Sequence, residues 1–116
     1  MLKKLFSISM VTCILCLCIT SNTKASVTYD DSVIYGASWN NGNIVVEMSS
    51  TDGYFRHFMA QINFFDSSNT QIDYMIGGAH SLSFYKEFRT SYSWDYAIVY
   101  FRIDHYIDET KIYNIN

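Results

Sequence analysis

Apolar and polar residues alternate over several short segments of this 116-residue chain, and turn-forming residues separate the segments. A period of two places every second side chain on the same face of a β-strand. The clearest apolar rows are Val33, Tyr35, Ala37 and Trp39; Phe58, Ala60, Ile62 and Phe64; and Ala97, Val99, Phe101 and Ile103. The pattern therefore predicts strands over residues 33–39, 58–64 and 94–103.

Turn signals join these strands into hairpins. Asn41-Gly42 precedes the apolar run 44–46, and Asn-Gly is the strongest short-range hairpin signal because both residues accept positive φ angles. Residues 66–69 form a second predicted turn, after which residues 72–76 return as a strand. We expect Gly77-Gly78 to end that strand.

The remaining apolar residues predict strands over 82–88 and 112–115. The chain has no proline and is rich in tyrosine, phenylalanine, isoleucine and valine, which favour strands. We therefore expect an all-β fold, a small antiparallel β-sandwich of about six to seven short strands.

The first 25 residues have the pattern of a cleaved signal peptide. Lys3 and Lys4 precede an apolar run over residues 5–19, and Thr23 and Ala25 supply small residues at the two positions that a signal peptidase reads. The run is shorter than the roughly 20 apolar residues of a membrane span. We expect a secreted protein with one domain over residues 26–116.

Removal of residues 1–25 changes the chemistry of the chain. It takes away all three cysteines, so neither a disulfide nor a thiolate ligand remains. It also takes three lysines from the eight basic residues and none of the eleven acidic ones, so the formal net charge changes from −3 to −6. This charge argues against nucleic acid as a partner. Because a small core without disulfides is marginal, self-association into a homo-oligomer is an alternative source of stability.

The histidines His57, His80 and His105 are the main candidates for chemistry. Serines lie near His80 in the sequence, but no Gly-x-Ser-x-Gly motif is present. We therefore expect no enzyme and no cofactor. Residues 104–109 (DHYIDE) offer oxygen and nitrogen ligands that suit calcium or zinc. A solvated turn is the alternative for this segment, and we predict no metal site.

Aromatic residues suggest a binding role. Tyr96 and Tyr100 alternate with the best apolar row, and Tyr85 likewise lies opposite Phe84 and Phe88. Exposed aromatic rings on a secreted sheet would stack on sugars or form a surface for self-association. Burial of both faces of the strand is the alternative.

Several spacings resemble those of a known family. The stretches are Gly36-Ala37-Ser38-Trp39-Asn40-Asn41-Gly42, Tyr74 followed by His80-Ser81, Trp94-Asp95-Tyr96-Ala97, and Tyr113-Asn114. In this order they are similar to the lactococcin 972 family of secreted bacteriocins from Gram-positive bacteria. The resemblance implies a small, self-associating β-sandwich that binds the envelope of competing cells without catalysis. It also implies that Trp39, His80 and Trp94 are framework or binding positions.

A second resemblance concerns the hairpin around residues 62–73. Its Ile62-Asn63-Phe64-Phe65-Asp66 stretch is similar to the hairpin of extracellular immunoglobulin-like domains of the FxLYD type. Such domains are adhesion or binding modules. The alternative function is therefore an extracellular immunoglobulin-like binding module for carbohydrate or protein.

Overall fold

The computed structural model describes residues 25–29 and 32–115. All of the predicted signal peptide except Ala25 lies outside the described residues, and Ala25 begins the first strand. The described part of the chain contains no helix long and apolar enough to cross a membrane.

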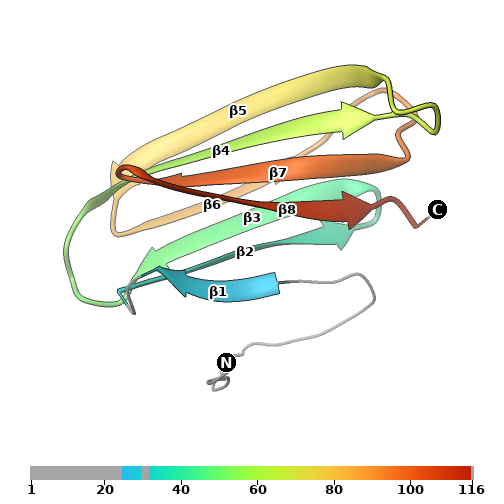
Figure 1. Ribbon diagram of the computed structural model, residues 1–116. Coiled ribbons are helices and arrows are strands. Elements are labelled where there is room, and N and C mark those ends of the chain that lie inside the picture. The colour runs from blue at the N-terminus through green and yellow to red at the C-terminus, as the bar shows by residue number, and fades with distance from the viewer. Residues whose placement is uncertain (1–24, 30–31, 116) are drawn as a thin grey trace.

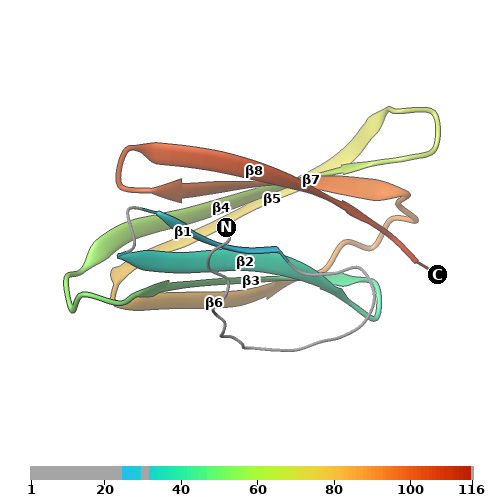
Figure 2. The same cartoon turned by 60° about the horizontal axis from the view of Figure 1, so that its bottom comes forward.

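The described residues form eight strands in two antiparallel sheets (Figure 1). The strands are β1 (Ala25–Tyr29), β2 (Val33–Asn40), β3 (Asn43–Ser50), β4 (Arg56–Phe65), β5 (Gln71–Ser81), β6 (Ser83–Phe88), β7 (Tyr96–Ile103) and β8 (Tyr106–Tyr113). One sheet has the order β1-β2-β3-β6, and the other has the order β5-β4-β7-β8. Figure 2 shows the sheets as two stacked layers. The predicted small antiparallel β-sandwich is confirmed, with seven strands from Val33 onward and β1 added at the edge.

The core fills the space between the two layers. The three apolar rows predicted from the alternation all face inward, and their side chains are buried except for the partly buried Trp39. They meet Ile44, Val46 and Met48 of β3, and Phe84 and Phe88 of β6. These buried aliphatic and aromatic side chains supply the main driving force for folding.

Both predicted hairpin turns are confirmed. Asn41 and Gly42 have φ angles of 52° and 88° and connect β2 to β3. Such a pair of positive φ angles matches the right-handed twist of the flanking strands. In the second turn, Asp66 Oδ1 accepts hydrogen bonds from the N–H groups of Ser68 and Thr70, and Asn69 has a φ of 66°.

Three strand predictions need correction. Gly77-Gly78 does not end the strand, because β5 continues to Ser81. The last strand covers residues 106–113 instead of 112–115, since polar side chains at the edge of a sheet hide its alternation. β7 begins at Tyr96 and not at Trp94. A Cβ atom on Gly78 would lie 2.5 Å from the Phe58 carbonyl oxygen, so this glycine permits the close approach of β4 and β5.

The chain changes sheet three times, between β3 and β4, between β5 and β6, and between β6 and β7. Around Leu82 it passes directly from β5 to β6, and the Leu82 carbonyl accepts a hydrogen bond of 2.8 Å from Ser50 N–H.

Candidate binding surface

The outward side of the β5-β4-β7-β8 sheet, here called the outer face, carries most of the candidate residues. Its residues alternate with the buried rows of β4 and β7, and the strand register extends the same side across β5 and β8. It comprises Met59, Gln61, Asn63 and Phe65; Tyr74 and Ile76; Tyr96, Ile98, Tyr100 and Arg102; and Ile107, Glu109, Lys111 and Tyr113. Within the described residues the other sheet packs only on the opposite side (Figure 2).

Four residues form a compact group at one end of the outer face, called the Tyr96 cluster. The rings of Phe65 and Tyr96 stack nearly parallel, with centroids 4.9 Å apart and an interplanar angle of 7°. Tyr113 lies 6.2 Å from Tyr96 at an angle of 51°. Lys111 Nζ lies 4.3 Å from the Tyr96 centroid and 5.0 Å from the Tyr113 centroid, within the range of cation–π attraction.

The polar contacts of this cluster restrain its rings. Tyr96 Oη donates a hydrogen bond to Asn69 Oδ1 at 3.0 Å. A side-chain hydrogen bond with Tyr113, followed by the nearby tyrosine oxygens, raises the pKa of Lys111. The cluster is therefore a preformed aromatic surface with a fixed positive charge.

Amide side chains occupy the middle of the outer face. Gln61 Nε2 donates to Asn63 Oδ1 at 2.9 Å. Tyr100 lies opposite Gln61 in β7, and Tyr74 lies opposite Asn63 in β5. Aromatic faces stack on the C–H groups of sugar rings, and amides exchange hydrogen bonds with their hydroxyls. The arrangement suits a sugar-containing ligand.

Tyr96 and Tyr100 are partly exposed on the outer face. The alternative in which both faces of their strand are buried is therefore wrong. Tyr85, on the outward side of the other sheet, is also exposed. Strand alternation predicted that the tyrosines lie opposite the core. Whether that side of the sheet is exposed to solvent depends on how the two sheets pack together.

His80 lies on β5 at the opposite end of the outer face from the Tyr96 cluster. Its imidazole is exposed and stacks on His57, its register partner in β4, with centroids 4.0 Å apart and an interplanar angle of 8°. The rings of Phe55 and His80 are nearly perpendicular, with centroids 5.8 Å apart and an interplanar angle of 84°. A hollow near His57 is lined by Met59, Arg102 and His105. His80 is therefore a surface residue.

The indole N–H groups of Trp39 and Trp94 form hydrogen bonds within the protein. Trp39 Nε1 donates to Asn114 Oδ1 at 3.0 Å, and Trp94 Nε1 donates to the Gly42 carbonyl at 3.2 Å. Asn114 Nδ2 donates to the Trp94 carbonyl at 2.9 Å. Both indoles thus satisfy their N–H groups inside the protein and join the two sheets at one end.

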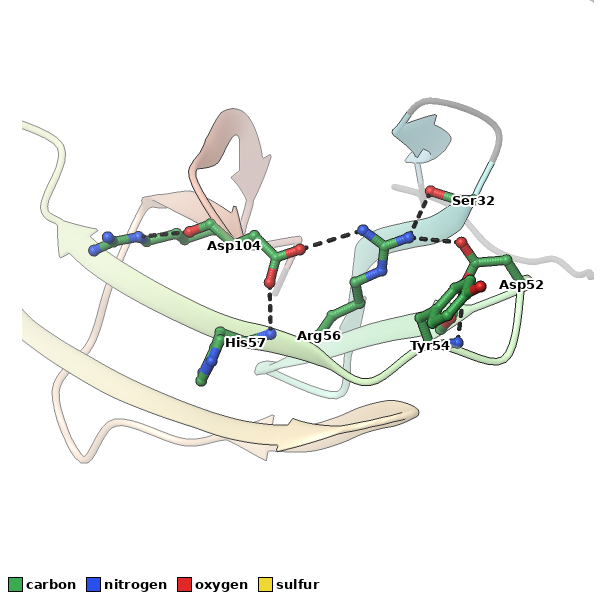
Figure 3. Close-up of polar contacts among 8 residues, drawn as sticks. Ser32, Asp52, Tyr54, Arg56, His57 and Asp104 are labelled. Carbon is green, nitrogen blue, oxygen red and sulfur yellow. Dashed lines mark hydrogen bonds and ion pairs between the residues drawn. The ribbon is translucent and has the colours of Figure 1, made fainter.

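The DHYIDE segment forms a turn and the start of β8. Asp104 has a φ of 54° in the β7–β8 turn, which aspartate tolerates better than most residues. Its Oδ1 accepts from the His57 backbone N–H at 3.0 Å, and its Oδ2 contacts Arg56 Nη1 at 3.2 Å (Figure 3). No group of three or more histidine, cysteine, aspartate or glutamate residues among the described ones is arranged to hold a metal ion.

Arg56 links three loops in a network that the sequence did not reveal. Its Nη2 contacts Asp52 Oδ2 at 2.6 Å and donates to Ser32 Oγ at 3.2 Å (Figure 3). Hydrogen bonds from the His57 backbone and Arg56 hold the pKa of Asp104 below its usual value. Ser50, the Tyr54 backbone and Arg56 do the same for Asp52. Only a long-range contact map would have identified this network, because its members come from three separate loops.

Comparison with known proteins gives no family assignment. No protein-family model, curated protein or solved structure gives a significant match to the chain.

Proposed function

We propose that this chain is a secreted bacteriocin-like protein that binds the envelope of competing Gram-positive cells without catalysis. The observation that carries the proposal is the open outer face, where Tyr74, Tyr96, Tyr100 and Tyr113 surround amide side chains. An exposed aromatic surface of this kind marks a site of interaction. Arg102 and Lys111 outnumber Glu109 on this face, so the outer face is less acidic than the predicted mature chain as a whole, whose formal net charge is −6.

The contacts of the tryptophans support the family resemblance. Trp39, Gly42, Trp94 and Asn114 belong to three separate stretches of the resemblance, and hydrogen bonds join all four at one end of the sandwich. A set of residues that is scattered in sequence and contiguous in space is consistent with a shared framework.

The surroundings of His80 support a role without catalysis. Its ring contacts are His57 and Phe55, whereas a nucleophilic mechanism needs a histidine beside a nucleophile and an orienting acid. Binding through stacked rings requires none of these groups.

The second candidate is an extracellular immunoglobulin-like binding module for carbohydrate or protein. The three changes of sheet along the chain favour it, because immunoglobulin-like sandwiches also distribute consecutive strands over two antiparallel sheets. In both candidate functions the outer face would be the binding surface. The two functions therefore differ in what this surface binds.

The test places purified protein on lawns of Gram-positive strains, beside the variants Tyr96→Ala and Tyr85→Ala. We expect zones of inhibition with the wild type and an activity about fivefold lower with Tyr96→Ala, since one lost stacking contact contributes about 1 kcal/mol. Tyr85→Ala is the matched control, because Tyr85 is an exposed tyrosine (64%) on the other sheet, and it should retain activity. Circular dichroism verifies that all three proteins are folded.

The outcomes separate the two candidates. Binding to isolated cell walls without growth inhibition would support the immunoglobulin-like module. A folded protein that neither inhibits growth nor binds cell walls, glycans or surface proteins would contradict both candidates.

A further inference from the structure

Two exposed histidines lie directly opposite each other on neighbouring strands. His57 of β4 and His80 of β5 are register partners, and their imidazoles stack with centroids 4.0 Å apart and an interplanar angle of 8°. Within the described chain, the side chains of both residues make ring contacts and no hydrogen bonds, since the bonds of His57 use its backbone. The lone pairs of both rings are therefore available to a ligand.

The backbone of His57 explains why the two rings are so close. Its carbonyl accepts a hydrogen bond from the Asp104 N–H at 2.9 Å, and its N–H donates to Asp104 Oδ1 at 3.0 Å. Both backbone groups of His57 thus point away from β5. His57 and His80 consequently form a non-hydrogen-bonded pair, the position in an antiparallel ladder where opposite side chains lie closest.

Neighbouring groups favour a fixed orientation of the pair. The Phe55 ring packs nearly perpendicular to the His80 ring at 5.8 Å, and the imidazole of His57 points away from the Arg56 guanidinium (Figure 3). Both histidines belong to paired strands, which hold side chains more precisely than loops do. The pair is therefore preorganised on a regular part of the sheet.

The geometry of the pair suits one metal ion. Zinc–nitrogen bonds are about 2.0–2.1 Å long, so two imidazole nitrogens bound to one zinc ion lie about 3–3.5 Å apart. Rings that are nearly parallel and 4.0 Å apart reach this separation when they tilt toward each other. Metal ligation requires neutral imidazoles, and parallel stacking suits neutral rings because two imidazolium charges at this distance would repel each other.

We propose that His57 and His80 chelate one divalent transition-metal ion of the kind that binds imidazole nitrogen, such as zinc, nickel or copper. Among the described residues no third histidine, cysteine, aspartate or glutamate completes a ligand set, so water fills the other coordination positions. The formal net charge of −6 on the predicted mature chain favours a cation. The expectation of no metal site rested on residues 104–109, whereas this pair exists only through the β4–β5 register.

The first test is isothermal titration calorimetry with zinc chloride. It uses the full chain without a histidine tag and with Cys13, Cys16 and Cys18 replaced by serine, because thiolates also bind zinc. We expect one zinc ion per chain. Calcium chloride should give no binding at the same concentrations, since calcium requires oxygen ligands.

Substitution by phenylalanine separates ligation from stacking. His80→Phe retains a ring against His57 and Phe55 but has no nitrogen, so the dissociation constant for zinc should rise at least about tenfold. His57→Phe should have the same effect. His105→Phe is the matched control, because His105 is an exposed histidine outside the stacked pair, and it should bind zinc as the wild type does. Circular dichroism verifies that the variants are folded.

The second test follows the ligands directly by NMR. Zinc should shift the imidazole resonances of His57 and His80 and leave those of His105 unchanged. Zinc should also raise the unfolding temperature of the wild type, since an ion that binds only the folded state stabilises it, and should not do so for His80→Phe.

Three results would overturn the chelate. The first is a wild type that does not bind zinc. The second is folded His80→Phe and His57→Phe proteins with wild-type affinity. The third is a stoichiometry of one ion per two chains, which would indicate bridging between copies. These measurements use no target cells, so they are independent of the proposed function.

Discussion

The indole N–H of Trp39 donates a hydrogen bond to the side-chain oxygen of Asn114 at 3.0 Å, across 75 positions of sequence. Trp39 belongs to β2, and Asn114 directly follows β8 in the other sheet. Asn114 also donates to the Trp94 carbonyl at 2.9 Å and bonds through its own N–H to the Asp95 carbonyl. One amide therefore joins both sheets and the segment before β7.

Replacement of Asn114 by alanine should lower the free energy of unfolding by about 1–3 kcal/mol, because it leaves the partly buried Trp39 N–H without its acceptor. Urea unfolding followed by tryptophan fluorescence measures the change. Asn40→Ala is the control, since Asn40 is exposed and its side-chain bond to Glu87 is long, at 3.5 Å. It should change stability by less than about 0.5 kcal/mol. Equal effects of the two substitutions would contradict the framework role of Asn114.

Tyr35 connects the sheets near the other end of β2. Its ring is buried against Phe101, with centroids 5.0 Å apart, and its hydroxyl donates to Asp108 Oδ2 at 2.7 Å. Burial, followed by hydrogen bonding with Tyr106 and Asp108, raises the pKa of Tyr35 far above its ordinary value. Tyr35 should therefore stay neutral in the folded protein when exposed tyrosines ionise.

The raised pKa of Tyr35 predicts that the free energy of unfolding decreases at alkaline pH. A group whose pKa is higher in the folded state contributes stability below its unfolded pKa of about 10, and this contribution is lost as the pH rises above that value. Tyr35→Phe should lower stability at neutral pH by about 1.5–3 kcal/mol, because the hydrogen bond to a charged group is lost. It should also flatten the decline above pH 10. Denaturant unfolding at neutral and alkaline pH measures both effects, and an unchanged alkaline slope would contradict the assignment.

Much of the fold was predictable because its signals are local. Asn41-Gly42 defines its hairpin through the φ angles that these residues accept, and the inward row from Ala97 to Ile103 follows from simple alternation. β8 was misplaced because Asp108 and Glu109 interrupt its apolar pattern. β1 was not expected, since a five-residue strand has little periodicity and depends on pairing with β2.

The candidate site was less predictable, since it depends on which sheet faces remain open. The sequence placed Tyr96 and Tyr100 opposite the core, but their exposure follows from the absence of a third layer over β7 in the described fold. The stacking of His57 on His80 depends on the register between β4 and β5. The contacts of Arg56 join loops that only the assembled sandwich brings together.

The charge of Asp104 should make the free energy of unfolding decrease at acidic pH. Its pKa is lowered in the folded protein, so its carboxylate contributes stability above the unfolded value of about 4, and this contribution disappears as the pH falls through the lower folded value. Asp104→Asn isolates the charge, because asparagine tolerates the φ of 54° and can still accept from the His57 N–H. The variant should be less stable at pH 7.

The pH dependence provides the control for this substitution. When the wild-type carboxylate is protonated, both proteins have a neutral side chain at position 104, so their unfolding free energies should converge as the pH is lowered toward about 2. Denaturant unfolding at a series of pH values measures the difference. A difference that is constant from neutral to acidic pH would show that the charge is not responsible.

The two adjacent glycines of β5 should respond very differently to alanine. A Cβ on Gly78 would lie 2.5 Å from the Phe58 backbone oxygen, whereas a Cβ on Gly77 would meet only side chains, Lys86 at 3.0 Å and the Phe88 ring at 3.2 Å. A lysine chain moves easily, but β4 can yield only by distorting its pairing with β5. Gly78→Ala should therefore destabilise the protein by about 1–3 kcal/mol, and Gly77→Ala by less than about 1 kcal/mol, because the reduced entropy of the unfolded chain offsets the adjustment. Thermal and urea unfolding at matched protein concentration measure both changes, and an equal or reversed order would contradict the close approach of β4 and β5.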